Sequence, residues 1–182
     1  MNRRQRLRRA RIQRLCWFGP PGLVGVLWAI GLLLPARHIE EERTGFDVSA
    51  ETVWAVLTDL DGMPTWRREL RALERLPDLE GRVRWIEVRS AGRSTTYQRV
   101  EAVSPRRLVV QSSAPSRRWV YEIRALDRGI ELTVREERDL LNPIMRTVLG
   151  LFGDRGRIDA LTADLSRRLA GRREQLASQS PD

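Results

Sequence analysis

The alternation of hydrophobic and polar residues in the second half of the chain predicts a series of β-strands. The alternating segments are separated by short stretches rich in Gly, Pro, Ser and Asp, which favour turns. Short connections join antiparallel neighbours, so these strands are expected to form an antiparallel sheet. The predicted strands are residues 82–90, 94–103, 106–113, 117–126 and 129–137, with an earlier strand at 39–48.

The remaining segments have the spacing of helices. Ser49 is a suitable N-cap for a helix that ends near residue 60, with Val53, Val56 and Leu57 on one face. A second short helix is predicted over residues 65–76. Asn142 and Pro143 predict the start of a long C-terminal helical region, in which spaced glycines between residues 150 and 156 indicate a bend. The order of elements predicts an α+β fold whose last helix covers one face of the sheet.

Residues 15–34 carry no charge and are long enough, at ~1.5 Å per residue, to cross a bilayer core as a helix. Seven arginines and no acid precede them, so the positive-inside rule predicts a cytoplasmic N-terminus and a single-pass protein of the cell membrane with an extracytoplasmic domain. A cleaved signal peptide and a buried or surface helix are the alternatives. Cleavage after Ala36 would put Leu34 at a position that requires a small residue, which favours the uncleaved anchor.

These features divide the chain into five parts. Residues 1–14 are expected to be a basic cytoplasmic tail, residues 15–34 a transmembrane helix, and residues 35–38 a connector. The folded domain is predicted at residues 39–172 and a flexible polar tail at residues 173–182.

Charge and composition exclude several classes of function. The net charge is +9, but the first fourteen residues supply seven of these charges, so the rest of the chain is nearly neutral and no nucleic-acid partner is expected. All 33 basic residues are arginine, which is typical of a GC-rich coding bias. With Cys16 and His38 as the only cysteine and histidine, the sequence predicts no metal site, no Ser-His-Asp triad and no cofactor.

Four segments, ETVWAVLTDLDGMPTW, SPRRLVV, RRWVYEI and GIELTVREE followed by NPIMR, occur in an order that resembles the START-like (SRPBCC) superfamily of polyketide cyclase/dehydrase and lipid-transport proteins. The resemblance covers residues 39–172 and extends to a subgroup that begins with one membrane-spanning helix. It implies a helix-grip fold, in which a curved antiparallel sheet wraps around a long C-terminal helix and encloses an apolar cavity. The segment GDRGRIDALTADL is more broken and more charged than this family's final helix.

Aromatic residues on the inward face of the predicted sheet are candidates for lining that cavity. Alternation places Trp119 and Tyr121 on one face together with Leu132 and Val134 of the next strand. The alternative is that they are ordinary core residues. The candidate ligand-pocket residues are Leu57, Trp66, Trp85, Tyr97, Trp119, Tyr121, Glu136, Met145, Leu149 and Phe152.

Glu136 lies on the same apolar face, and a carboxylate there must be solvated, paired or protonated. One interpretation is a residue at the sheet rim that meets water or an arginine, with Arg99 and Arg135 as candidate partners. The other is a polar group at the mouth of the cavity, which binds a ligand head group or acts as an acid or base.

The function predicted from the sequence is membrane-tethered binding of a hydrophobic small molecule or lipid in a cavity between the sheet and the last helix. A cyclase- or dehydratase-like enzyme that uses Glu136 with Tyr97 or Tyr121 is a second hypothesis. An envelope protein-interaction module with a filled core is the third, and the sequence names no protein partner.

Overall fold

The computed structural model describes residues 21–90, 92–113, 116–153 and 156–178. The chain forms two compact units. Within the described ranges, one contains residues 21–38 and 139–153, and the other contains residues 39–138 and 156–178.

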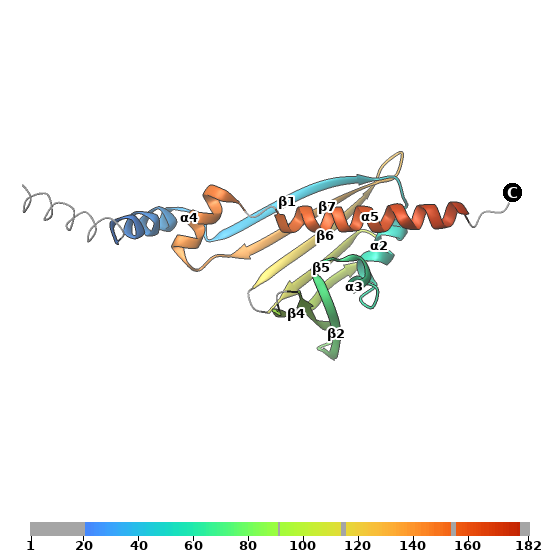
Figure 1. Cartoon of the computed structure of the whole chain (residues 1–182), viewed down its shortest axis with the longest axis horizontal. Helices are drawn as coiled ribbons and strands as arrows, with labels where there is room; N and C mark the ends of the chain where they lie inside the picture. The colour runs from blue at the N-terminus through green and yellow to red at the C-terminus, as the bar shows by residue number, and fades with distance from the viewer. Residues whose placement is uncertain (1–20, 91, 114–115, 154–155, 179–182) are drawn as a thin grey trace, which may run out of the picture. The chain divides into compact units, whose positions relative to one another are not determined.

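The larger unit is built on a seven-stranded antiparallel sheet (Figure 1). Its strands follow the order β1-β7-β6-β5-β4-β3-β2, so all strands after β1 pair with their neighbours in sequence. The strands are β1 (Arg37–Phe46), β2 (Leu70–Leu79), β3 (Arg82–Arg89), β4 (Ser94–Val103), β5 (Arg107–Ser112), β6 (Arg117–Ala125) and β7 (Ile130–Asp139).

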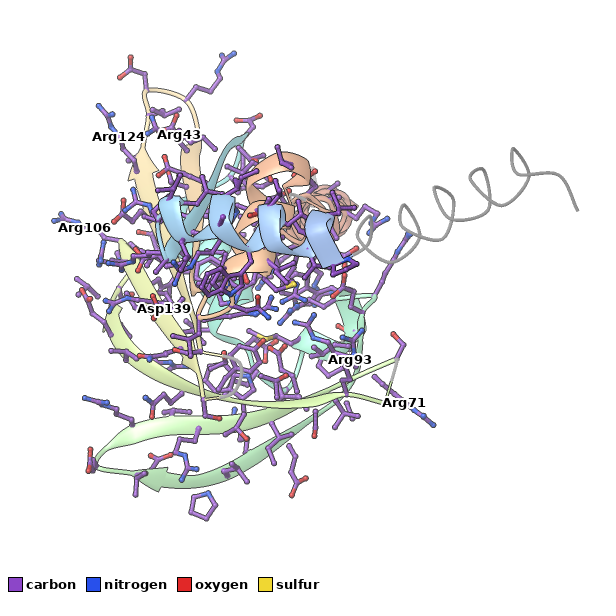
Figure 2. The ribbon with its side chains drawn as sticks, turned by 90° about the vertical axis from the view of Figure 1, so that its left-hand side faces the viewer. Arg43, Arg71, Arg93, Arg106, Arg124 and Asp139 are labelled. Carbon is purple, nitrogen blue, oxygen red and sulfur yellow. The ribbon has the colours of Figure 1, made fainter. Side chains whose placement is uncertain are left out.

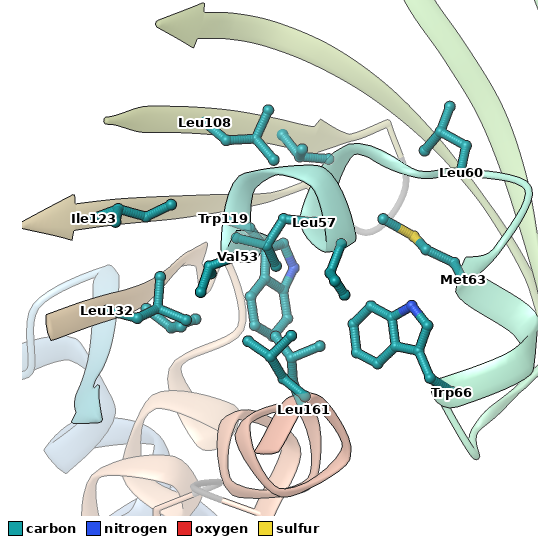
Figure 3. Close-up of a cluster of buried hydrophobic side chains, with 14 of the residues drawn as sticks. Val53, Leu57, Leu60, Met63, Trp66, Leu108, Trp119, Ile123, Leu132 and Leu161 are labelled. Carbon is teal, nitrogen blue, oxygen red and sulfur yellow. The ribbon is translucent and has the colours of Figure 1, made fainter. Parts of the chain in front are cut away.

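Three helices lie on the inner face of this sheet: α2 (Ala50–Thr58), α3 (Met63–Trp66) and α5 (Gly156–Ser178). The backbone N–H of Thr52 donates to Ser49 Oγ at 3.2 Å, which confirms Ser49 as the N-cap of α2. Figure 3 shows Leu161 of α5 beside Trp119 of β6, with Leu57 of α2 close by. The α+β arrangement of a curved sheet around a C-terminal helix is therefore confirmed.

The core lies between the sheet and these helices, because the apolar residues of each element face the same side. Leu132 and Val134 alternate along β7 with half-exposed residues, as a strand with one buried face requires. The most deeply buried apolar side chains are Val53, Leu60, Val109, Ile130, Leu132, Val134 and Leu165.

The prediction of a second helix over residues 65–76 is wrong. Only Met63–Trp66 are helical, and Leu70–Leu79 form β2 at the edge of the sheet. Leu70, Leu73 and Leu76 recur every third residue as in a helix, but a register shift between Leu70 and Ala72 adds a residue to the strand. Pro77, which lacks an N–H, is tolerated because β2 is an edge strand.

The last hairpin has the predicted turn. Ala125 of β6 is opposite Ile130 of β7, and the backbone N–H of Leu126 donates to the carbonyl of Gly129 at 3.1 Å. Gly129 has φ +76°, and a Cβ at this position would lie 2.1 Å from the carbonyl oxygen of Phe46 in β1. A glycine is therefore needed here both for its conformation and for the close approach of β1.

The smaller unit contains a helix over residues 21–33 and α4 (Pro143–Phe152). Asn142 caps α4 through its side chain and Pro143 is in the first turn, as predicted. The Thr147 hydroxyl donates to the carbonyl of Leu27 at 2.7 Å and so joins the two helices. The C-terminal region consists of two helices, α4 and α5, and Gly153, which directly follows α4, has φ +65°.

The predicted transmembrane segment is only partly within the described chain. Residues 15–20 lie outside it, as does the basic tail at 1–14. In the part of the chain that the structure describes, no helix is both long and apolar enough to cross a bilayer. The transmembrane helix therefore stays a prediction.

Candidate functional site

Two pairs of aromatic side chains line the inner face of the sheet. Trp85 and Tyr97 are opposite each other on β3 and β4 and stack with ring centroids 5.9 Å apart. Trp119 and Tyr121 are two residues apart on β6 and stack at 6.4 Å. The alternation of each strand sends both pairs to the face that α5 covers.

These rings border a small cavity of about 40 Å³ between the sheet and helices α2, α3 and α5. A cavity of this size has room for a few water molecules in this conformation. Its apolar wall is formed by Leu57, Leu60, Met63, Trp66, Trp85, Leu108, Val110, Trp119, Ala160 and Leu161, and its polar groups come from Arg67, Glu69, Glu87, Tyr97, Arg99, Tyr121, Arg157 and Asp164.

The structure brings together six of the ten residues that the sequence suggests for the pocket. Leu57, Trp66, Trp85, Tyr97, Trp119 and Tyr121 all line the cavity. Met145, Leu149 and Phe152 lie on α4 in the smaller unit, and Met145 is exposed. These three residues lie on a helix separate from α5, because α4 ends at Phe152 and Gly153 caps it.

Glu136 is fully buried and lies in a cluster of arginines. Arg138 Nη2 donates to its Oε2 at 2.7 Å and Arg117 Nη1 donates to its Oε1 at 3.0 Å. Arg157 of α5 lies 3.8 Å from the same Oε1. With its oxygens committed to guanidinium groups, Glu136 positions arginines and is poorly placed to act as a base.

The two partners suggested for Glu136 are wrong. Arg135 precedes it on β7 and therefore faces the other side of the sheet, where it donates to Glu41 at 2.8 Å. Arg99 lines the apolar cavity instead. The true partners come from the neighbouring strand β6, from α5, and from the next inward position of β7.

A wider recess of about 310 Å³ adjoins the cavity. The two spaces share Glu69, Tyr97 and Arg157 in their walls. The remaining walls of the recess come from β3, β4, β6 and the β3–β4 turn, and they are formed by Arg89, Ser90, Arg93, Thr95 and Arg117. The site thus has an apolar inner part and an arginine-rich outer part.

Glu87 is a site residue that the sequence reasoning missed. It is 2% exposed, lines the cavity, and accepts a hydrogen bond from Arg67 at 2.7 Å through Oε1. Its position could have been predicted, because Glu87 lies two residues after Trp85 on the same strand and therefore faces inward with it.

Three buried polar atoms of residues that line the cavity have no hydrogen-bond partner among the described residues. They are Trp119 Nε1, whose residue is 5% exposed, Arg99 Nε, and Glu87 Oε2, which has only Arg89 at 3.7 Å. In Figure 3 the indole nitrogen of Trp119 is directed toward the space between Leu57 and Trp66. Unsatisfied buried donors and acceptors are costly, so the site is equipped to hydrogen-bond a guest molecule.

Both tyrosines of the chain border the cavity, and both hold their protons tightly. Burial, reinforced by the Glu87 carboxylate, raises the pKa of Tyr97 above its ordinary value. Burial also raises the pKa of Tyr121, although Arg67 opposes the shift. Both hydroxyls are therefore neutral donors at physiological pH. No cluster of three or more His, Cys, Asp or Glu side chains in the described ranges could hold a metal ion.

Solved structures of known proteins share this fold. Norcoclaurine synthase from Thalictrum flavum superposes with a TM-score of 0.61 at 10% identity, over 75% of this chain and 96% of that one. Protein NE0264 from Nitrosomonas europaea gives 0.57 at 14% identity, over 75% and 96%. The di-domain aromatase/cyclase StfQ of the steffimycin biosynthetic pathway gives 0.58 at 11% identity, and the match covers 75% of this chain and 53% of StfQ, about half of that protein. At sequence identities this low, the similarity shows a shared fold and nothing more.

No curated protein matches the chain by sequence. A family model described as polyketide cyclase / dehydrase and lipid transport matches residues 37–173, most of the chain and nearly all of the larger unit. Together with the sheet, the C-terminal helix and the cavity between them, this match shows that the chain belongs to the polyketide cyclase / dehydrase and lipid transport family.

Proposed function

We propose that the larger unit binds a hydrophobic small molecule whose apolar part enters the cavity between the sheet and α5. The observation that carries this proposal is the unpartnered indole N–H of Trp119 in the apolar part of the cavity wall. Small-molecule sites are typically apolar, with a few polar groups that orient the ligand. Membership in a family that includes cyclases and lipid-transport proteins supports the same assignment.

The size of the site favours a compact ligand over a long acyl chain. The apolar cavity measures about 40 Å³, and the adjoining recess about 310 Å³. Small-molecule sites in proteins usually measure about 300–1,000 Å³, so a ligand must occupy both spaces. A long acyl chain would fit only if α5 moved away from the sheet.

Binding of the neutral probe N-phenylnaphthylamine to the full chain tests this proposal. Ala160 lines the cavity from α5, whereas Ala163 on the same helix is exposed. Ala160→Phe fills the cavity, and it is expected to weaken saturable probe binding at least about tenfold. Ala163→Phe adds the same side chain outside the cavity, and should bind as wild type does.

The proposal fails if the wild type shows no saturable binding or if the two variants bind equally. Uptake of the probe by the apolar helices of the smaller unit is common to both variants and does not affect their difference. A protein-interaction module with a filled core would give no difference.

We further propose that the smaller unit tethers the domain to a membrane. Of the fifteen large hydrophobic residues exposed in the described chain, eleven belong to this unit. Ten of them lie on the two short helices and Leu141 lies just before α4. Soluble proteins rarely expose so many apolar side chains in so short a part of the chain. These residues are Leu23, Val24, Val26, Trp28, Ile30, Leu32, Leu33, Leu141, Met145, Val148 and Leu151.

Membrane fractionation tests the tether. The full chain is expected to remain with membranes after alkaline carbonate washing, and a chain that lacks residues 1–34 is expected to be released. Recovery of the full chain in the wash would contradict the tether without bearing on ligand binding.

An enzymatic role is a second candidate, and one observation favours it. Glu87 Oε2 is a buried carboxylate oxygen without a hydrogen-bond partner in the described chain, at a cavity that also has two neutral tyrosines. A cyclase-like reaction would use Glu87 as proton acceptor and a tyrosine hydroxyl as donor to a carbonyl oxygen. Glu87→Gln should then abolish turnover and leave probe binding intact, whereas turnover that survives this substitution would exclude the role.

A further inference from the structure

The recess beside the cavity combines four arginines with little negative charge. Arg89 and Arg117 have side chains that are 15% and 18% exposed, and Arg157 is 25% exposed. Arg93, in the β3–β4 turn, is exposed and has no side-chain partner among the described residues. Glu69 is the one carboxylate in the described wall of this recess.

The positions of these arginines are fixed from behind by buried carboxylates. Glu136 holds Arg117 at 3.0 Å and lies 3.8 Å from Arg157, and Glu87 lies 3.7 Å from Arg89. Arg89 also donates to the Tyr97 hydroxyl at 3.4 Å and to Glu69, in the wall of the recess, at 3.1 Å. Because Glu136 lies behind Arg117 and Arg157, the remaining N–H groups of these two arginines are available to face the recess.

The carboxylates do not balance the arginines. The ion pairs of the described residues form two networks, one of Arg67 and Arg89 with Glu69 and Glu87, and one of Arg117, Arg138 and Arg157 with Glu40 and Glu136. Arg93 adds one more cation, so that in the described part of the chain these ion pairs and Arg93 comprise six arginines and four glutamates. Partly desolvated guanidinium groups with an excess of positive charge favour the binding of an anion, and their planar geometry matches carboxylate, phosphate or sulfonate oxygens.

We infer that the ligand is an amphipathic anion, whose carboxylate, phosphate or sulfonate group binds in the recess formed by Arg89, Arg93, Arg117 and Arg157 while its apolar body enters the cavity. Arg157 and Tyr97 lie at the junction, because both line the two spaces. The inference rests on the proposed function, to which it adds the chemical class of the ligand. Glu136 acts here as a positioning residue, since it holds Arg117 and Arg157 toward the recess.

Two probes with the same aromatic rings distinguish binding of an apolar body in the cavity from binding of an anionic group in the recess. N-phenylnaphthylamine is neutral, and anilinonaphthalene sulfonate carries the same rings with an added anionic group. The full-length wild type is expected to bind the sulfonate more tightly than the neutral probe, with a preference that falls as salt is added. Competition by short-chain carboxylates and alkyl phosphates then shows which anionic group the recess binds more tightly.

The decisive variant is Arg93→Gln/Arg157→Gln, which removes two cations of the recess and leaves Glu136 paired with Arg117 and Arg138. Sulfonate affinity is expected to fall at least about tenfold, equivalent to about 1.4 kcal/mol. Neutral-probe affinity is expected to fall clearly less, because Arg157 is only one residue of the cavity wall and Arg93 lies outside it. Arg124→Gln is the matched control, because Arg124 is exposed on β6 and lies well away from Arg93 in Figure 2.

Each outcome is decisive. Equal binding of the two probes, or a double variant that keeps wild-type sulfonate affinity, overturns the anion site and leaves the proposed function standing. Failure of both probes to bind overturns the proposed function and the anion site with it. Circular dichroism on each variant verifies that the fold is retained.

Discussion

Arg117 of β6 donates to Glu136 of β7 at 3.0 Å, and Glu136 has no exposed surface. An arginine at the wall of the recess is therefore held by a carboxylate in the protein interior. The pair explains why an apolar strand face ends in an acid. The carboxylate offsets the charge of arginines that would otherwise be buried next to one another, and burying such charges without a partner is costly.

Glu136→Gln removes this negative charge and nearly preserves the shape of the side chain. Arg117, Arg138 and Arg157 then face one another without compensation, so the free energy of unfolding should fall by about 3 kcal/mol or more. Urea denaturation of the full chain measures this loss.

Glu41→Gln provides the control for that experiment. Glu41 pairs with Arg135 at 2.8 Å on the solvent-facing side of the sheet, and its removal should cost less than about 1 kcal/mol. Equal losses for Glu41 and Glu136 would show that the buried cluster contributes no more than a surface pair.

The raised pKa values of the two tyrosines predict that the stability of the fold depends on pH. The chain has two tyrosines, and burial raises the pKa of each above the ordinary value of 10.0. The folded protein therefore holds these protons more tightly than the unfolded chain. This contribution to stability is complete below pH 10.0 and is lost as the pH rises above it, toward the folded-state values.

Tyrosinate absorbance and tryptophan fluorescence, recorded through the same alkaline titration, measure this effect. Ionisation of Tyr97 and Tyr121 is expected to coincide with unfolding. Ionisation of both at the ordinary pKa, with the fold intact, would show that neither hydroxyl is buried at the cavity.

Much of the fold is predictable from the sequence. The last hairpin is the clearest case, because the alternation of Ile130, Leu132 and Val134 determines the face of the strand, and this face carries Glu136 inward as well. The edge strand β2 is not predictable in this way. Its leucines recur every third residue, and its bulge and its pairing with β3 depend on contacts that are distant in sequence.

The site is predictable only in its apolar part. Trp85, Tyr97, Trp119 and Tyr121 follow from strand parity. The partners of Glu136 do not, because Arg117 and Arg157 reach it from other elements of the chain. Which face a residue occupies is local information, whereas the choice of ionic partner depends on the tertiary arrangement.

Two glycine substitutions test whether β1 packs against the turn of the last hairpin. Gly81 and Gly129 have φ of +72° and +76°, but only at Gly129 would a Cβ meet another strand, 2.1 Å from the Phe46 carbonyl oxygen. Gly81→Ala should cost about 1–2 kcal/mol for its left-handed backbone alone. Gly129→Ala should cost clearly more in thermal or urea unfolding. Equal costs would show that β1 does not pack against the turn.

A fluorescent label tests whether α4 contacts lipid. Leu151 on α4 is 68% exposed and Leu126, in the β6–β7 turn, is 48% exposed. With Cys16→Ser removing the only native cysteine, an environment-sensitive dye is attached to Leu151→Cys or to Leu126→Cys in the full chain.

In liposomes the dye at residue 151 is expected to shift its emission to the blue and to be reached by a lipid-phase quencher. The dye at residue 126 should behave as it does in water. Identical emission from the two positions would contradict the membrane contact of α4.

The most direct measurement of the central claim is a crystal structure of the full chain with bound anilinonaphthalene sulfonate. The account predicts that the rings lie between Trp119 of β6 and Leu161 of α5, in contact with the Trp119 indole, and that the sulfonate contacts Arg93 and Arg157. A probe found elsewhere, with the cavity between the sheet and α5 still closed, would contradict it.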